Sequence, residues 1–338
     1  METIENTGEK LVDINSRGKD RDWGGKKRRN MRMFDIITRA NDIQAGENGF
    51  HLFSDKTLES IEHCGDWLEF AHYEDGSKKL HRANFCRHRL CPLCNWRKSL
   101  KLFGQVSKIT EAILQDKKAR FIFGTLTIRN VTASELTAAL DDMNEGFKWL
   151  FQPSRTYSPA KLFKSNLMGY MKALEITYNS EKDTYHPHIH FVGEVRPSYF
   201  NGEGYIDKTG WKELWKGAMH LDYDPQVNIK AIRNNGNRET PDPGAVAEVA
   251  KYPIKVDNLL NIQDTDTAAK AVITFQTVCK NRRFVTFGGD FREYARRLRL
   301  SDVENGDLVH VETDENIKAA PVFLTLWKYN ARFGCYIN

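Results

Sequence analysis

Three histidines alternate with other residues in the segment YHPHIHFVGEV, residues 185–195, and this pattern constrains the fold more than any other part of the chain. Side chains two apart in a β-strand point to the same face, so His188 and His190 present their imidazoles side by side while Ile189 faces the opposite way. Histidines near strand ends are often ordinary polar surface. Three in alternation beside an apolar strand instead favour a metal site on a rigid element.

A second predicted strand precedes the histidines. The segment GYMKALEITYN, residues 169–179, is separated from them by the turn-rich SEKDT, so the two segments predict an antiparallel hairpin. Glu175 lies within the apolar stretch ALEIT, which makes its carboxylate the expected third ligand. Two imidazoles and one carboxylate with open positions suit Mn²⁺ or Mg²⁺ as a Lewis acid, although His-rich ligation also suits Zn²⁺.

The other apolar patterns predict an α+β fold in which helices flank a central antiparallel sheet. β-branched and aromatic residues predict strands, and three- and four-residue spacing of apolar residues predicts helices. The predicted strands are 119–131 and 227–232, and the predicted helices are 95–115, 133–152 and 211–219.

A further helix is predicted to end at Tyr252. It begins with Asp242 as the N-cap, and Pro253 removes the donor that would continue it. Glu248 lies four residues before Tyr252, so the carboxylate and the phenol share one helix face. Such pairs are common on helix surfaces, but the histidine site needs a nucleophile. A tyrosine with an ordinary pKa of about 10 attacks poorly at neutral pH unless a metal stabilises the developing charge.

Three cysteines, Cys86, Cys91 and Cys94, fall within nine residues, and Cys64 precedes them. This clustering is typical of a metal site in a reducing cytosol and not of a secreted disulfide scaffold. Four thiolates suit a structural, tetrahedral Zn²⁺. The spacing also matches three ligands of a plant-type iron–sulfur centre, and free thiols are a third interpretation. Three histidines are alternatives to Cys64 as fourth ligand: His63, His81 and His88.

Basic residues are concentrated in three runs, and the net charge of the chain is +5. One basic run is usually a solvated face, but three in one chain favour contacts with the phosphate backbone of a nucleic acid. The side chains expected to bind DNA are Arg87, Arg89, Arg97, Lys98, Lys101, Lys251 and Lys255.

Four regions are expected along the chain. Residues 1–45 are polar and basic without a sustained apolar period, which predicts a flexible arm. Residues 46–115 hold the cysteines, 116–300 hold the histidine and tyrosine motifs, and 301–338 are expected to extend from the core and pack on it. No apolar run approaches the roughly 20 residues that span a bilayer, and the first residues lack the apolar core of a signal peptide. We therefore expect a soluble, cytoplasmic protein.

These motifs, in this order, closely resemble those of the rolling-circle replication initiators of small bacterial plasmids, in the HUH endonuclease superfamily. FCRHRLCPLCNWRKSLK resembles the family's cysteine block, FGTLTIRN its first motif, HPHIHFV its metal motif and EVAKYPIK its nucleophile motif. The resemblance covers roughly residues 60–300. It implies a palm or ferredoxin-like antiparallel sheet that carries the histidines, with the tyrosine presented from a helix across its face.

The resemblance also implies an activity and its partners. Tyr252 would cut one strand at the plasmid's double-strand origin and keep the 5′ end as a phosphotyrosine, and a water activated by Glu248 would complete the closing cut. The expected substrate is origin DNA extruded as a hairpin with a single-stranded nick site. A host helicase and DNA polymerase would then extend the free 3′ end. Mn²⁺ or Mg²⁺ is the expected catalytic ion, and Zn²⁺ the structural one.

Two other classes of protein share part of this pattern. A mobilisation relaxase or a single-strand transposase has similar histidines and a tyrosine, but acts on a transfer origin or a transposon end. The cysteine block and Glu248 favour a replication protein over both. A non-enzymatic, zinc-dependent DNA-binding regulator is the remaining alternative, and it would not need Tyr252.

Overall fold

The computed structural model describes residues 8–15, 18–151, 164–202, 204–232, 255–311 and 320–338. The chain divides into two compact units. The first comprises Met1–Lys101, Leu259–Thr277 and Asp302–Asn338, and the second comprises Leu102–Asn258 and Val278–Ser301. Each unit is built on one antiparallel sheet with helices, so the predicted α+β class is confirmed.

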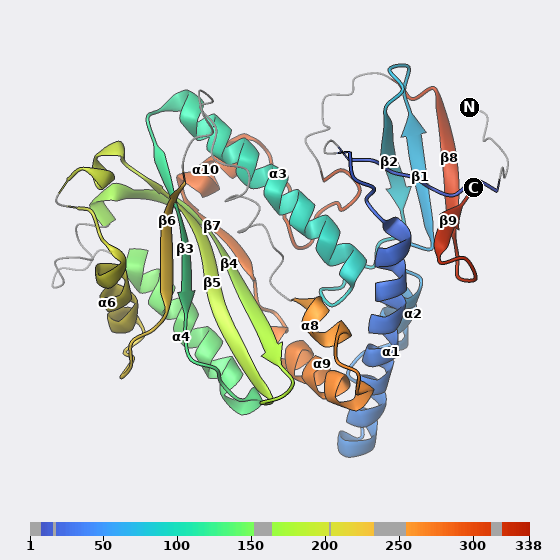
Figure 1. Cartoon of the computed structure of the whole chain (residues 1–338), viewed down its shortest axis with the longest axis horizontal. Coiled ribbons are helices and arrows are strands. Elements are labelled where there is room, and N and C mark those ends of the chain that lie inside the picture. The colour runs from blue at the N-terminus through green and yellow to red at the C-terminus, as the bar shows by residue number, and fades with distance from the viewer. Residues whose placement is uncertain (1–7, 16–17, 152–163, 203, 233–254, 312–319) are drawn as a thin grey trace. The chain divides into compact units, whose positions relative to one another are not determined.

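The sheet of the second unit has five strands in the order β6-β3-β5-β4-β7, and every neighbouring pair is antiparallel (Figure 1). The two longest strands form the hairpin that the sequence predicts around the histidines. The strands are β3 (Arg120–Thr127), β4 (Leu167–Asn179), β5 (Thr184–Val195), β6 (Val227–Ile232) and β7 (Val285–Gly289).

Two helices, α4 (Ala133–Phe151) and α6 (Lys208–Ala218), pack on one face of this sheet. Phe191 of β5 contacts Phe147 of α4 and Trp211 of α6, with ring centroids 5.7 Å apart in both pairs. Aromatic side chains dominate the energetics of such cores, because each buries a large apolar area. The residues of β5 that alternate with Phe191, the histidines among them, therefore face the opposite side.

That opposite face is covered at one end by α10 (Asp290–Arg297). Phe121 of β3 contacts Phe291 of α10 edge to face, at 6.2 Å between ring centroids. Glu194, fully buried on β5, has its Oε1 atom 2.6 Å from the ammonium of Lys117, which also contacts Asp290. The histidines lie on the same face of β5, four and six residues before Glu194.

The sheet of the first unit has four strands in the order β2-β1-β8-β9. Its core surrounds Trp23, whose ring lies 6.2 Å from Phe70 and 4.8 Å from Trp96. The strands are β1 (Trp67–His72), β2 (Lys78–Ala83), β8 (Phe323–Asn330) and β9 (Cys335–Ile337). The remaining elements in the described part of the chain are α1 (Trp23–Asn48), α2 (Asp55–Glu62), α3 (Pro92–Asp116), α8 (Val256–Leu260), α9 (Thr265–Cys279) and the 3₁₀ turn η1 (Pro197–Phe200).

The prediction of a flexible arm over residues 1–45 is wrong for α1, which is a helix of 26 residues. Its buried stripe includes Trp23, Met33 and Ile37. Polar side chains continue this stripe: Lys27 is 2% exposed and its ammonium lies 2.6 Å from the Asp66 carboxylate. Buried polar residues interrupt the periodic spacing of apolar residues in this helix. The polar composition of the segment therefore predicts an unfolded arm.

The structure also corrects the predicted boundaries of the regions: 116–300 is not one unit, because Leu259–Thr277 belongs to the first unit. Residues 320–338 do not form an extension on the core, because β8 and β9 complete the sheet of the first unit, where Trp327 pairs with Leu68. The segment 46–115 is not one unit either, because the division between units falls within α3, after Lys101.

Most predicted elements agree with the structure to within three residues. The strand at 227–232 is reproduced as β6, and the helix expected from Asn95 begins at Pro92. The helix predicted to run from Asp242 to Tyr252 lies outside the described residues. Among the helices that the structure describes, none is both long and apolar enough to cross a membrane.

Candidate metal centres

The register of the β4–β5 hairpin brings the three predicted ligands together. Glu175 lies directly opposite His188, and His190 is two residues further along the same face of β5. The Oε2 atom of Glu175 is 3.4 Å from Nε2 of His188 and 3.0 Å from Nε2 of His190. The three donor atoms therefore point toward one another from two adjacent strands, as the sequence predicts.

Hydrogen bonds hold both imidazoles with their Nε2 atoms toward Glu175. Nδ1 of His190 lies 3.0 Å from the hydroxyl of Thr125 on β3, and Nδ1 of His188 lies 3.2 Å from the main-chain oxygen of His186. Phe123 stacks on the ring of His190 with centroids 5.8 Å apart. Contacts of this kind orient histidine ligands toward a metal.

Glu175 is fully buried, and a buried carboxylate needs compensating charge. The ammonium of Lys255 lies 2.5 Å from its Oε1 atom. Burial raises the pKa of the Glu175 carboxyl, but hydrogen bonds from His188, His190 and Lys255 outweigh it and hold that pKa well below its ordinary value. Glu175 is therefore ionised at neutral pH, as a metal ligand has to be.

The donor atoms of Glu175, His188 and His190 lie within 4.8 Å of one another, so one ion can contact all three. Two imidazole nitrogens and one carboxylate oxygen form a set that binds divalent metals and leaves coordination positions for substrate oxygens. This site defines the chain as an α+β protein with a potential metal centre on the face of an antiparallel sheet.

Thr125 is a site residue that the prediction does not include. It lies in the segment FGTLTIRN, and it pairs with His190 across the β3–β5 ladder. A signal is present in the sequence, since polar Thr125 and Thr127 alternate with buried residues of β3 and so mark one face of a strand.

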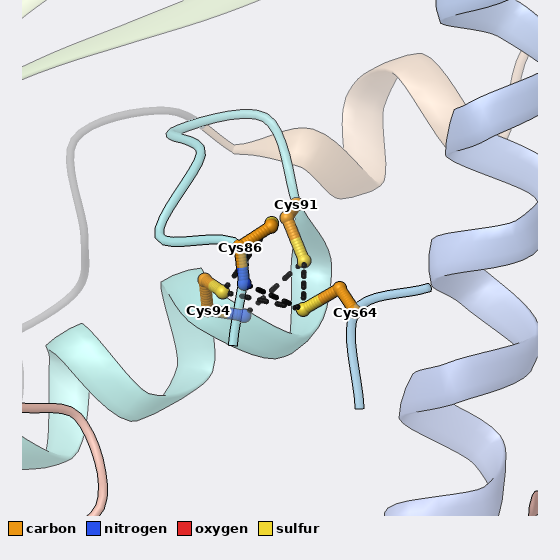
Figure 2. A group of neighbouring side chains, drawn as sticks. All are labelled: Cys64, Cys86, Cys91 and Cys94. Atoms are coloured by element: carbon orange, nitrogen blue, oxygen red, sulfur yellow. Dashed lines mark hydrogen bonds between the residues drawn. The ribbon is translucent and has the colours of Figure 1, made fainter. Parts of the chain in front are cut away.

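The second candidate centre consists of the four predicted cysteines (Figure 2). Sγ of Cys64 lies 3.5 Å from that of Cys94 and 3.6 Å from that of Cys91, and Sγ of Cys86 lies 3.7 Å from that of Cys94. A tetrahedral zinc with Zn–S bonds of about 2.3 Å separates its sulfur atoms by about 3.8 Å. The cluster could therefore hold a single zinc ion.

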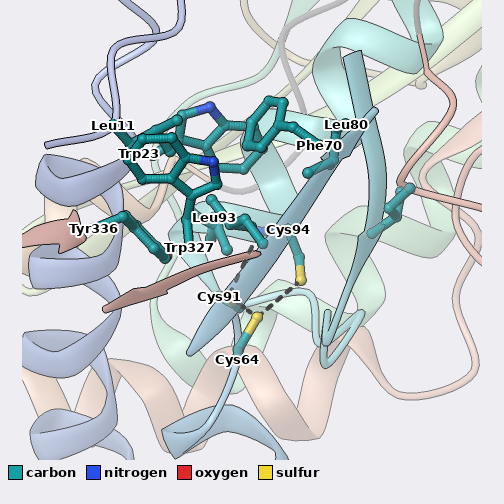
Figure 3. Packing of buried hydrophobic residues seen from close by; sticks show 12 residues of the cluster. Leu11, Trp23, Cys64, Phe70, Leu80, Cys91, Leu93, Cys94, Trp327 and Tyr336 are labelled. Carbon is teal, nitrogen blue, oxygen red and sulfur yellow. Dashed lines mark hydrogen bonds between the residues drawn. The ribbon is translucent and has the colours of Figure 1, made fainter. Parts of the chain in front are cut away.

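Main-chain amides support the sulfur atoms. The amide of Arg87 donates to Sγ of Cys94 at 3.2 Å, and the amide of Cys86 donates to Sγ of Cys64 at 3.3 Å. Cys64, Cys91 and Cys94 also belong to the buried core of the first unit, together with Trp23 and Tyr336, and the partly buried Cys86 packs against this core (Figure 3). Such hydrogen bonds stabilise thiolates, and the apolar surroundings exclude water from them.

Cys64 is the fourth member of the cluster, and the alternative histidines are not. His63 contacts the carboxylate of Asp66 at 2.8 Å, and His81 lies 3.9 Å from Glu69. Nδ1 of His88 accepts a hydrogen bond from the amide of Leu90.

Three of the side chains predicted to bind DNA are buried. Arg97, Lys98 and Lys101 are 4%, 2% and 3% exposed. Their nitrogen atoms donate to main-chain carbonyl oxygens of the first unit at 2.6–2.9 Å. These positions contradict a role in contacting phosphates, because a DNA backbone cannot reach them. They bind loops of their own unit instead.

The other side chains predicted to bind DNA are not buried in this way, or lie outside the described residues. Arg87 is exposed, and Arg89 is half-buried beside the cysteines. Lys255 belongs to the histidine site through Glu175. Lys251 lies outside the described residues, as do the two proposed catalytic residues Glu248 and Tyr252.

Comparison with known proteins identifies the family. Residues 77–336 match the family model described as "Replication protein". The chain is 39% identical over 320 residues to "Protein rep" of Streptococcus pneumoniae serotype 2 (strain D39 / NCTC 7466), covering 94% of this chain and 92% of that protein. It is 36% identical over 351 residues to "Protein rep" of Bacillus amyloliquefaciens, covering 100% and 99%. No solved structure matches the chain.

The chain belongs to this replication protein family. The resemblance to the rolling-circle replication initiators of plasmids, which the motifs indicate, is thereby confirmed.

Proposed function

We propose that this protein initiates rolling-circle replication by cutting one DNA strand at the double-strand origin of a plasmid through a covalent tyrosine intermediate. The observation that carries the proposal is the convergence of Glu175, His188 and His190 on one sheet face in a chain of the replication protein family.

Tyr252 is the proposed nucleophile. Its phenolic oxygen, once deprotonated, attacks the scissile phosphorus, and the bond from phosphorus to the 3′ oxygen breaks. The leaving 3′ oxygen takes up a proton and becomes the primer end, while the 5′ phosphate stays on the tyrosine. One phosphodiester is exchanged for another, so the step needs no ATP.

The residues of the histidine site fit a divalent ion, for which we propose Mn²⁺ or Mg²⁺. When bound, this ion supplies Lewis-acid stabilisation of charge on the phosphate oxygens. His188, His190 and Glu175 would hold it, with Thr125 fixing the ring of His190. Lys255, whose ammonium already contacts Glu175, is close enough to help hold the phosphate, and Lys251 shares that proposed role.

A second cut has to end each round of synthesis, and the nucleophile motif contains one tyrosine. Glu248 is the proposed base that activates water for this closing cut. The nick site has to be single-stranded to enter such a centre, which favours origin DNA extruded as a hairpin. Arg87 and Arg89 are proposed to grip its backbone, and a host helicase and polymerase to extend the 3′ end.

The proposed role of zinc in the four-cysteine cluster leads to a prediction. Cys91→Ser should release about one zinc ion per chain and lower the free energy of unfolding by about 3 kcal/mol or more, since zinc binding contributes roughly 10–16 kcal/mol to the folding of small zinc domains. Metal analysis and thermal unfolding of the purified protein measure both effects.

Cys335→Ser is the matched control, because Cys335 is half-buried and outside the cluster. It should leave the zinc content unchanged. Iron with a visible chromophore, or a Cys91→Ser variant that keeps its metal, would contradict the zinc assignment.

The proposed activity is tested with a supercoiled plasmid that carries the origin of the protein's own replicon. Incubation with Mn²⁺ should convert it to a nicked circle with the protein attached to the 5′ end, and EDTA should prevent this. Attachment without preference for the replication origin would indicate a relaxase or transposase. Origin binding without cleavage would indicate a regulator.

A further inference from the structure

A groove of about 620 Å³ opens on the second unit next to the histidine site. Thr125 and Thr127 of β3 form part of its lining, and other residues come from α6 and from the start of β6. These others are Lys208, Thr209, Lys212, Asp224, Pro225, Gln226, Val227 and Asn228. Its volume is that of a site for small ligands, so it suits nucleotides of a single strand and not a duplex.

The groove continues the rows of side chains that form the histidine site. Thr125 pairs with His190 on one side and with Asn228 on the other. Because residues directly opposite in a sheet share a face, Asn228, Thr125 and His190 form one row. Adjacent strands lie about 4.8 Å apart, so the Cα atoms of Asn228 and His190 are about 10 Å apart.

The neighbouring row of side chains also crosses from β5 through β3 to the start of β6. Thr127 pairs with His188, and its amide donates to the main-chain oxygen of Gln226 at 3.2 Å. Gln226 and Asn228 are exposed, whereas Val227 between them is buried. The alternation of side chains therefore places both amides on the sheet face that carries the histidines, while Val227 reaches the groove from the other face.

The part of the lining that α6 forms carries lysines. Because α6 packs on the sheet face opposite the histidines, this part lies across the β6 edge of the sheet from Thr125. Lys208 is exposed, and the ammonium groups of Lys212 and Lys216 lie 2.6 Å and 2.9 Å from the carboxylate oxygens of Asp224. Lys208 and Lys212 line the groove together with Asp224, so its lining carries one positive charge in excess, and the ion pairs of Lys212 and Lys216 with Asp224 reduce the repulsion between that carboxylate and a phosphate. A strand with a charged backbone and polar bases matches this lining.

We propose that the groove binds the nucleotides next to the cleaved phosphate, and that Gln226 and Asn228 select their bases. This inference rests on the proposed cleavage of single-stranded origin DNA. A side-chain amide offers a donor and an acceptor side by side, which matches the edge of adenine with two hydrogen bonds. The lysines of α6 contact the backbone, so they contribute to affinity and not to selection.

The experiment uses a single-stranded oligonucleotide that spans the nick site of the replicon's own origin, and a series in which one nucleotide at a time near the nick is made abasic. The wild-type protein should lose about tenfold in cleavage rate at one or two of these positions. Asn228→Ala and Gln226→Ala should each cleave the intact oligonucleotide about tenfold more slowly than the wild-type protein does. For each variant, removing the base that the missing side chain contacts should cause no further loss of cleavage rate.

Lys230→Ala is the matched control, because Lys230 is an exposed residue of the same strand but does not line the groove. Lys230→Ala should show the same cleavage rate as the wild-type protein on every oligonucleotide of the series. The melting temperatures of all variants should be unchanged. If the wild-type protein cleaves no oligonucleotide, the proposed function itself fails. The groove proposal alone is overturned by either of two results. In the first, the wild-type protein cleaves, but Asn228→Ala and Gln226→Ala respond to each abasic position as the wild-type protein does; in the second, Lys230→Ala changes the cleavage rates at the same positions.

Discussion

His190→Ala is expected to reduce metal-dependent cleavage of origin DNA by at least about 10²-fold while binding to duplex origin DNA changes little. His190 would lose its bond to the ion, and Glu175 would lose one of its two imidazole partners, at 3.0 Å. Affinity for the duplex depends on the basic surface instead. Cleavage rates at several Mn²⁺ concentrations, Mn²⁺ binding by calorimetry and a mobility-shift assay separate the two properties.

His186→Ala provides the control on the same strand. The main-chain oxygen of His186 accepts from His188, and alanine keeps that contact. This variant should bind Mn²⁺ and cleave DNA much as the wild-type protein does. Loss of duplex binding in His190→Ala, in proportion to the loss of cleavage, would mean that the histidine has a structural role.

The histidine site could be predicted from the sequence because strand periodicity determines which side chains share a face. Once residues 169–179 and 185–195 form a hairpin, alternation brings Glu175 beside His188 and His190. Thr125 belongs to a strand more than 40 residues earlier in the sequence, so its place depends on the pairing order of the sheet. The sequence does not contain that order in any local pattern.

The helix α1 illustrates why other parts could not be predicted. Asn30 is buried because its side-chain amide donates to the main-chain oxygen of Ile61 at 2.7 Å, and Lys27 is buried because it contacts Asp66. Both partners lie more than 30 residues away. Buried polar groups are stable only when such partners exist, so the burial of a polar residue follows from the tertiary fold and not from its own segment.

The basic residues after the cysteines also show that a segment does not determine by itself which of its polar residues are buried. Their sequence suggests a surface that binds DNA, yet Arg97, Lys98 and Lys101 donate hydrogen bonds to loops of their own unit. Charge patterns report how many cations are present but not which of them are already paired. The groove beside the histidine site, in contrast, has only two lysines in its lining and is not apparent from charge runs.

Tyr252→Phe is expected to lower strand cleavage by at least about 10³-fold and to abolish the covalent 5′ adduct, because it removes only the attacking oxygen of the proposed nucleophile. The fold, the Mn²⁺ affinity and the binding of origin DNA should persist. Denaturing gels of labelled oligonucleotides measure cleavage and adduct together, and a thermal melt checks the fold. A variant that still forms the adduct would assign the nucleophile to another residue.

Glu248→Ala is the comparison that separates the nucleophile from its neighbour, since both lie in the same motif. If Glu248 activates water for the closing cut, its loss should leave initial nicking and the 5′ adduct near normal. Replication would then run past the origin and give multimeric single strands instead of unit-length circles. If Glu248 only positions the predicted helix with Tyr252, both cuts should weaken together. Initial nicking and release of unit-length product, measured in the same variant, therefore decide the matter: a parallel loss of both would remove the proposed role of Glu248 and leave that of Tyr252 intact.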